Sequence, residues 1–284
     1  MRNGQNDGFA LVVVIWAIGI LALLFMTYIA AARYRSIEAS SLAQHARAEA
    51  MANIGVNLAI LDILSGISRG ATRSARFGSD GTPVFCTLGD GRVAISVVDE
   101  GGKVDLNTAN LELIEALIGG VNSNGRVAAL VAKSIQKLRE APTGTRSGQG
   151  VSSSATALRS VFELNQVAGM DRDLFQALVP LVTVHSGSTG VDPGVAPLEL
   201  LRAVSPGNRS SSREAARKGL PAFYVAESAG KVFLVESEAL TTSGARFSRG
   251  AIVEFEPPVS YRIREWRDGS LRVIDSADAG GPPC

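Results

Sequence analysis

The chain has 284 residues, 46% of them hydrophobic, which suffices for one large domain or two small domains with buried cores. Its 28 basic and 27 acidic side chains give a formal net charge of +1, so no overall field favours nucleic acid or acidic partners. Only two histidines occur, His45 and His185, and the sequence contains no GxSxG, HExxH, P-loop or paired-cysteine motif. We therefore expect a protein that is not an enzyme.

The amino-terminal region contains an uncharged run of 24 residues, Phe9 to Ala32. As a helix this run would be ~36 Å long, enough to cross a hydrocarbon core of ~30 Å. A secretory signal peptide would have a shorter apolar stretch of ~7–15 residues before small residues at its cleavage site. Ala30–Ala32 keeps signal peptidase cleavage open as an alternative.

The residues after this run predict that the helix continues. Arg33–Leu64 is rich in Ala, Leu, Glu, Gln and Arg and contains no proline, and Gly66 and Gly70 provide a stop. One helix over residues 9–65 would extend ~85 Å, so its first half, residues 9–32, must lie in lipid or in a filament. Its buried face is expected at apolar residues spaced three and four apart: Ile54, Leu58, Leu61 and Leu64.

A short polar segment, residues 1–8 (MRNGQNDG), precedes the apolar run. The Gly8–Phe9 junction resembles the site cut by prepilin peptidase, which leaves the apolar stretch in the mature protein. The alternative is a signal anchor that is never processed. Arg2 precedes the run and Arg33 and Arg35 follow it, so the distribution of positive charge does not decide the orientation.

Two stretches, residues 66–100 and 220–284, are predicted to form an antiparallel sheet of four to six strands that packs on the long helix. Gly89–Gly91 supplies the turn of a hairpin between Val84–Leu88 and Arg92–Val98. Four further segments alternate apolar and polar residues or are rich in β-formers: Ala222–Ser228, Lys231–Leu240, Ala245–Glu256 and Tyr261–Ile274.

The region between these stretches, residues 101–219, has helical periodicity and is predicted to be an inserted helical domain. Its apolar stripes are centred on Leu111–Ile118, Val127–Leu138 and Leu174–Leu181, and Ala141–Ser154 and Ser205–Ser212 are predicted loops.

The inserted region contains an internal repeat, because Val104–Leu117 matches Val191–Val204 at seven of fourteen positions. Asn107 and Thr108 are expected to cap the first helix of the pair, and Pro197 suits the first turn of the second. Phe162–Met170 predicts a helix, a short turn and a helix, so the region resembles helix-hairpin-helix units.

Four segments in this order resemble one known family: Gly8–Phe9 with the apolar run after it, Asp99–Asn110 (DEGGKVDLNTAN), Phe162–Met170 (FELNQVAGM) and Tyr261–Trp266 (YRIREW). The family is the minor pseudopilin K family of type II secretion systems, also called general secretion pathway protein K. The resemblance covers nearly the whole mature chain. It implies an α+β fold in which a pilin-like long amino-terminal helix packs on an antiparallel sheet, with a large inserted all-helical domain of helix-hairpin-helix or SAM-like type.

The resemblance also implies a function. Members of this family cap the pseudopilus tip with the minor pseudopilins I and J and other pseudopilus subunits, and the filament helps to export folded proteins across the outer membrane. It implies cleavage by prepilin peptidase, N-methylation of Phe9, one pass through the bacterial inner membrane and a carboxy-terminal body in the periplasm. The second repeat departs from the family, since it reads VDPGVAP where a VNxNTAP-like phrase is common.

Val13 is the fifth mature residue if Phe9 is the first. Most pseudopilins have glutamate there, to pair with the terminal amine of a neighbouring subunit, and the K family lacks it. Calcium is known in the family, and Asp99 and Glu100 are candidate ligands. The alternative for these two is that they cap or pair at the end of a strand.

Two cysteines, Cys86 and Cys284, are too few for a disulfide framework and lack the spacing of metal ligands. They could form one bridge if the body is periplasmic. We expect instead that Cys86 is a small buried hydrophobic residue and that Cys284 is a thiol in the tail.

A membrane-anchored helix-hairpin-helix DNA-binding protein of a competence-like system is the alternative function. Residues 99–204 contain nine Lys or Arg and eleven Asp or Glu, a local net charge of −2. Binding to phosphates requires basic side chains and exposed amides, so we expect no nucleic-acid partner.

Overall fold

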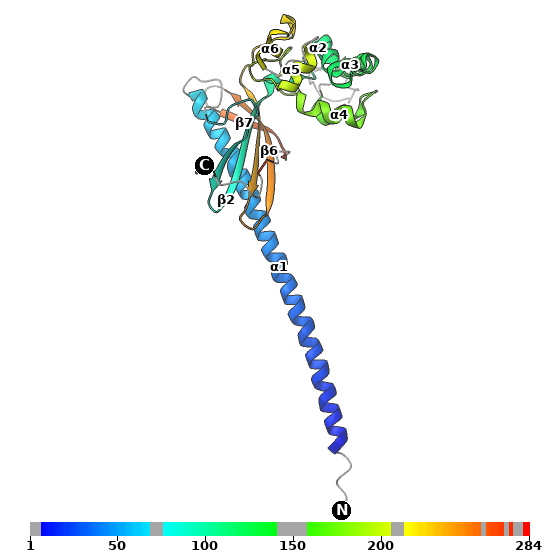
Figure 1. Ribbon diagram of the computed structural model, residues 1–284, viewed down its shortest axis with the longest axis vertical. Helices are drawn as coiled ribbons and strands as arrows, with labels where there is room; N and C mark the ends of the chain where they lie inside the picture. Colours follow the sequence, from blue (N-terminus) through cyan, green and yellow to red (C-terminus); the bar gives the residue numbers. More distant parts are fainter. Residues whose placement is uncertain are drawn as a thin grey trace, which may run out of the picture.

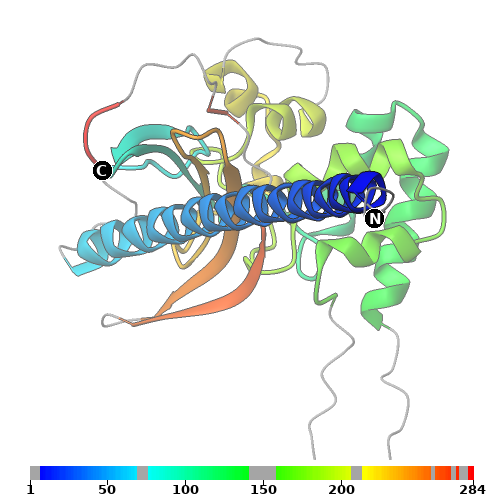
Figure 2. The ribbon, with the colours of Figure 1, turned by 90° about the horizontal axis from the view of Figure 1, so that it is seen from below.

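The structure, a computed structural model, describes residues 7–68, 76–140, 158–205, 213–256, 260–269, 273–274 and 281–284. A single long helix, α1 (Asp7–Ser68), runs from the amino terminus past an antiparallel sheet (Figure 1). A group of smaller helices lies at the end of the sheet farthest from the amino terminus, to one side of the line of α1. Seen from below, helices α2–α4 gather to one side of the strands (Figure 2).

The helix α1 has 62 residues and therefore a length of ~93 Å. It contains no proline, and Ala, Leu, Ile and Val dominate its composition, so nothing in its sequence interrupts the backbone hydrogen bonds. The side chains of residues 11–43 are exposed, whereas the second half of the helix packs on β2, β5 and β6. The sheet thus covers only the carboxy-terminal half of α1.

The sheet has five strands in the order β1-β2-β5-β6-β7, and all neighbours are antiparallel. The strands are β1 (Val84–Leu88), β2 (Gly91–Asp99), β5 (Val232–Leu240), β6 (Arg246–Glu256) and β7 (Ser260–Asp268). The expected hairpin joins β1 and β2, with Leu88 opposite Gly91 and Gly89 at φ 61° in the turn. The expected strand at Ala222–Ser228 is wrong: its first residues form a 3-10 turn, η4 (Ala222–Tyr224).

The contact between α1 and the sheet combines small and large apolar side chains of the helix. Ala48, Ala52 and Ala59 are fully buried, and Gly55 lies among them. The buried face expected at Ile54, Leu58, Leu61 and Leu64 is wrong in part, because Ile54 is 44% and Leu61 is 61% exposed. The small residues let the strands approach the helix closely, and the larger residues Val56, Ile60 and Ile63 fill the rest of this contact.

The insert between β2 and β5 has its own core, separate from the core between α1 and the sheet. Its longer elements are α2 (Leu111–Asn122), α3 (Gly125–Glu140), α4 (Arg172–Leu178), α5 (Leu198–Val204) and α6 (Arg213–Lys218). The 3-10 turns η1 (Glu100–Gly102), η2 (Val161–Gln166) and η3 (Val179–Leu181) and the short parallel strands β3 (Val104–Asp105) and β4 (Val182–Thr183) complete it. The helical periodicity did not predict this parallel pair. The loops expected at Ala141–Ser154 and Ser205–Ser212 lie outside the described residues, apart from Ser205.

The internal repeat has a structural counterpart. Each copy begins with an extended valine, and its helix, α2 or α5, starts seven residues later. Asp105 and Asp192 occupy the same repeat position, and the C=O of each accepts the N–H four residues on, at 2.9 Å in both copies. The capping expected of Asn107 and Thr108 is wrong, since their side chains bond to other loops of the insert. An aspartate therefore forms the turn before each helix.

Candidate functional site

The predicted processing site lies at the start of α1. Gly8 and Phe9 are in its first turn, residues 1–6 of the expected leader lie outside the described residues, and Phe9 is 75% exposed. Val13 is half exposed and lies one turn beyond Phe9, on the same face of the helix. The structure thus brings Phe9 and Val13 together at the amino-terminal end of the apolar segment.

The apolar segment of α1 is long and apolar enough to cross a membrane. None of its large side chains between Phe9 and Ile29 is buried by the described part of the chain. The next residues, which include Arg33 and Arg35, are exposed along the helix. Beyond them, the Ser243 hydroxyl donates a hydrogen bond to Gln44 Oε1 at 2.8 Å, where the sheet region meets the helix. The body is thus separated from the apolar segment by an exposed helical neck, residues 33–43.

The insert is joined to the sheet at a compact polar junction. The Asp99 carboxylate accepts hydrogen bonds from the Gly101 N–H and from the Ser228 hydroxyl, each at 2.8 Å. Asp192 accepts the Ser228 N–H at 3.2 Å and donates its own N–H to the Gly101 C=O at 2.9 Å. Burial raises the pKa of the Asp99 carboxyl, and the charges of Asp192 and Glu100 act in the same direction. Ser228, which precedes β5, therefore contacts both the end of β2 at Asp99 and the second repeat at Asp192.

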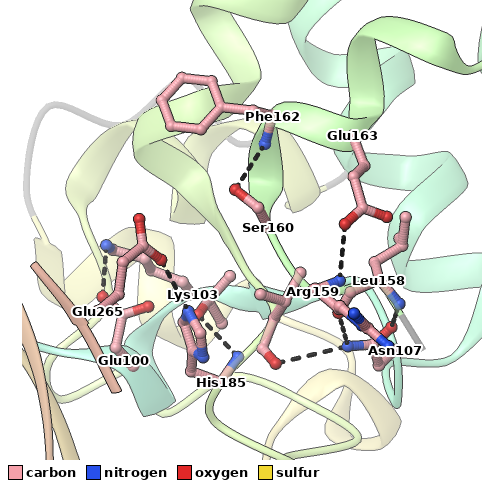
Figure 3. A network of polar contacts seen from close by, with 12 residues as sticks. Glu100, Lys103, Asn107, Leu158, Arg159, Ser160, Phe162, Glu163, His185 and Glu265 are labelled. Atoms are coloured by element: carbon pink, nitrogen blue, oxygen red, sulfur yellow. Dashed lines mark hydrogen bonds and ion pairs between the residues drawn. The ribbon is translucent and has the colours of Figure 1, made fainter. Parts of the chain in front are cut away.

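A second set of polar contacts lies beside this junction (Figure 3). The Lys103 ammonium and the Glu100 carboxylate form a buried ion pair at 2.6 Å. His185 of the insert faces Glu265 of β7, with Nε2 and Oε2 3.6 Å apart. These residues line a cleft of about 290 Å³ between the insert and the sheet face that points away from α1. Of the two contacts, the one between His185 and Glu265 joins the insert to the sheet.

The calcium candidates do not fit a metal site. Hydrogen-bond donors engage Asp99, and the ammonium of Lys103 neutralises Glu100 at 2.6 Å. No group of three or more His, Cys, Asp or Glu side chains suited to a metal occurs within the part of the chain that the structure describes. The two residues therefore act as the capping and pairing carboxylates of the alternative interpretation.

The helical hairpin of the insert differs from a phosphate-binding turn. A Cβ built on Gly120 would stand 2.0 Å from the Ala203 C=O, so this glycine serves the packing of α2 on α5. Ser123, at φ 57°, ends α2. Arg139 donates to the C=O groups of Leu106 and Ala109, and burial lowers the pKa of its guanidinium. One of the basic side chains of the insert is thus used internally.

The expectation for the two cysteines is wrong in part: Cys86 on β1 is buried as expected, but Cys284 is not a free thiol, because the two form a disulfide. The tail residues 281–284 lie beside β1, where Thr87 donates its N–H to the Pro282 C=O at 2.9 Å. The cysteines are 198 residues apart, so their spacing gave no signal. Sequence reasoning also missed Glu238, a fully buried carboxylate that binds the N–H groups of Val273 and Ile274.

A long helix that is apolar in its first half and packed on an antiparallel sheet in its second half defines a pilin-like α+β fold, here with a helical insert between β2 and β5. No protein-family model and no curated protein sequence matches the chain.

A solved structure does match: a chain in the crystal structure of the GspK-GspI-GspJ complex from the Type 2 Secretion System of enterotoxigenic Escherichia coli. The similarity covers 84% of this chain and 99% of that one, with a TM-score of 0.54 and 17% sequence identity. The expected α+β fold, with a pilin-like long helix packed on an antiparallel sheet, is confirmed.

Proposed function

We propose that this chain is a minor pseudopilin at the tip of a type II secretion pseudopilus and that it assembles with minor pseudopilins I and J. The observation that carries the proposal is the fold. The similarity covers 84% of this chain and 99% of a chain from a GspK-GspI-GspJ complex, so it extends beyond the long helix and the sheet into the insert. The protein contributes structure to the export of folded proteins across the outer membrane.

The arrangement of α1 supports an inner-membrane anchor with the body in the periplasm. Residues 9–32 would span the bilayer once, and the neck would hold the body away from it. The Cys86–Cys284 disulfide supports an oxidising compartment for the body, since such bonds form and persist in the periplasm and are rare in the cytosol. Prepilin peptidase would cut between Gly8 and Phe9, and Phe9 would then be N-methylated.

The tip position rests on Val13 and on the insert. A subunit inside a filament shaft would pair its fifth-residue carboxylate with the terminal amine of a neighbour, because an unpaired charge in an apolar core costs several kcal/mol. Val13 offers no carboxylate, which suits a subunit with no neighbour ahead of it. The insert lies to one side of α1 and would obstruct side-by-side packing in a shaft (Figure 1).

The proposal is tested with the full-length tagged chain in a strain whose own copy is deleted. We expect the chain to restore secretion, to copurify with pseudopilins I and J from detergent extracts, and to label one end of the filaments in electron micrographs. Val13→Glu should leave membrane insertion intact and should reduce secretion by altering the order of assembly, whereas Val14→Glu is the matched control for charge in the apolar segment. Label spaced regularly along filaments would contradict the tip assignment.

A further inference from the structure

The tail of the chain lies against the sheet at two separate points. After β7, at one edge of the sheet, residues 273–274 lie beside β5 and β6, and residues 281–284 lie beside β1 at the opposite edge. Ile274 packs with Ala94 and Leu240, whose neighbours Val93 and Ala239 face α1. Since side chains alternate along a strand, Ile274 lies on the face of the sheet that α1 does not cover.

At the first attachment point, residues 273–274 are held by a buried charged side chain, that of Glu238. Glu238 Oε2 accepts the N–H groups of Val273 at 2.6 Å and of Ile274 at 3.0 Å, and Arg246 pairs with the other carboxylate oxygen. Arg246 also donates to the Ile274 C=O at 2.7 Å. Charge-assisted hydrogen bonds of this kind are stronger than neutral ones, and the Glu238 carboxylate that accepts them is fully buried. This attachment does not depend on the cysteines.

The second attachment point, residues 281–284, is different in kind. Besides the disulfide, its hydrogen bonds are two between Thr87 and the tail, each at 2.9 Å, and those from the Arg76 guanidinium to the C=O groups of Cys284 and Pro283. Pro282 and Pro283 are exposed, and Cys284 is only half-buried. Little apolar surface therefore keeps this segment in place once the sulfur–sulfur bond is broken.

We propose that residues 281–284 are a redox-operated latch over the β1 edge of the sheet. The latch closes when Cys86 and Cys284 are oxidised and opens when they are reduced, while the Glu238 attachment stays closed in both states. In the closed state Thr87 is paired with the tail in a parallel bridge, so an edge strand is covered. In the open state Thr87 loses its two backbone hydrogen bonds to the tail, and its N–H and C=O groups become accessible to water.

The chemistry of the latch is thiol–disulfide exchange. Closing forms one S–S bond from two thiols and transfers two electrons and two protons to a disulfide oxidant, which leaves as a dithiol. Opening is the reverse reaction with a dithiol reductant. The inference goes beyond the proposed secretion role, because it depends only on contacts within this chain and would hold for a protein of another function.

Hydrogen exchange followed by mass spectrometry tests the latch on the full-length chain in detergent, in oxidised and reduced dithiothreitol. We expect peptides containing Thr87 and Cys284 to exchange at least tenfold faster in the reduced protein. Peptides from β5 and β6 and those containing Val273 and Ile274 should exchange at the same rate in both states. Equal protection of Thr87 in both states, or loss of protection across the whole sheet on reduction, would overturn the proposal, as would two free thiols under oxidising conditions.

Two variants separate the attachment points. The Cys86→Ser, Cys284→Ser double variant should behave like the reduced protein and should not respond to dithiothreitol. Glu238→Gln should accelerate exchange at Val273 and Ile274 and leave Thr87 protected while the disulfide is intact. If the double variant does not fold, the comparison of oxidised and reduced wild-type protein still decides the question.

Discussion

Gly55 of α1 lies so close to Ser237 of β5 that a Cβ built on Gly55 would stand 2.1 Å from the Ser237 hydroxyl oxygen and 3.0 Å from its Cβ. A side-chain atom of Val93 on β2 is also 3.0 Å from that position. Contacts under 3 Å are repulsive, so the separation between the helix and the sheet depends on the missing side chain at position 55. The helix and the sheet can therefore come this close at position 55 only because it is glycine.

The Gly55→Ala variant should be less stable than the wild type by about 1 to 3 kcal/mol, the usual cost of adding a methyl group to a packed core. Alanine is the better helix former by about 1 kcal/mol, so a loss of stability would report the steric clash and not helix propensity. Denaturant unfolding of the full-length chain measures the change. Gly19→Ala is the matched control, since nothing lies within 4 Å of a Cβ at Gly19. Equal stability of the two variants would contradict the close approach.

Ser237→Ala should stabilise the protein by about 1 kcal/mol. Its Oγ is buried, and no hydrogen-bond partner for it occurs among the described residues, so the hydroxyl has lost its hydration without compensation. The same change should recover part of the stability lost in Gly55→Ala, because it removes the nearest atom. A double-mutant cycle on the two positions measures the coupling, and strict additivity would count against a direct clash.

Asp99→Asn should raise the stability of the protein relative to the wild type, and the gain should be larger at pH 8 than at pH 4. Burial raises the pKa of Asp99 in the folded state above its unfolded value. The contribution of Asp99 to the stability of the wild type is therefore fully present at low pH and is lost as pH rises through the folded pKa. Asparagine removes this loss and can keep the hydrogen bonds to Gly101 and Ser228. Melting temperatures of both proteins between pH 4 and pH 8 test the sign, and parallel curves would contradict it.

Glu254→Gln should have the opposite pH dependence. Hydrogen bonds from Arg264, and then from Arg262, lower the pKa of Glu254 from 4.5 to about 2. Its stabilising contribution is therefore complete above the unfolded value and is lost as pH falls through about 2. The variant should melt below the wild type at pH 7, and the two curves should converge as pH approaches 2. A constant difference across this range would show that the ion pairs do not contribute.

Gly8→Trp should block maturation, because the peptidase expected from the family resemblance requires a small residue before the cut. In membranes that contain prepilin peptidase, the wild type should begin at Phe9 and the variant at Met1, as N-terminal sequencing and intact mass would show. Gly4→Trp changes bulk in the leader away from the junction and should be processed normally. A wild-type start near Arg33 would instead indicate signal peptidase.

The helical period identified α1 from sequence but assigned its buried face in part to the wrong residues. Ile54 and Leu61 repeat with the same period as Ala48, Ala52 and Ala59, so periodicity fits either face. The choice between them is made by the close approach of β5 and β2, which is a tertiary property. Local patterns therefore locate a helix more readily than they orient it.

The junction and the tail were beyond prediction for a related reason. Asp99, Asp192 and Ser228 are far apart in sequence, and only the return of the chain from the insert brings them together. Likewise, Cys86 and Cys284 are neighbours only because residues 281–284 lie beside β1, from which they are remote in sequence. By contrast, the hairpin at Gly89, the repeat and the long apolar run each depend on short segments, and the sequence patterns located them.

The helix α1 passes without a described break from the apolar segment into the body, so its two halves form one rigid shaft. A turn of the apolar half about its own axis would rotate the sheet through the same angle. The insert lies off this axis, so the same turn would sweep it around an arc at the far end of the molecule (Figure 1). Torque applied within the bilayer would in this way become a sideways displacement of the insert, with no hinge between them to absorb it.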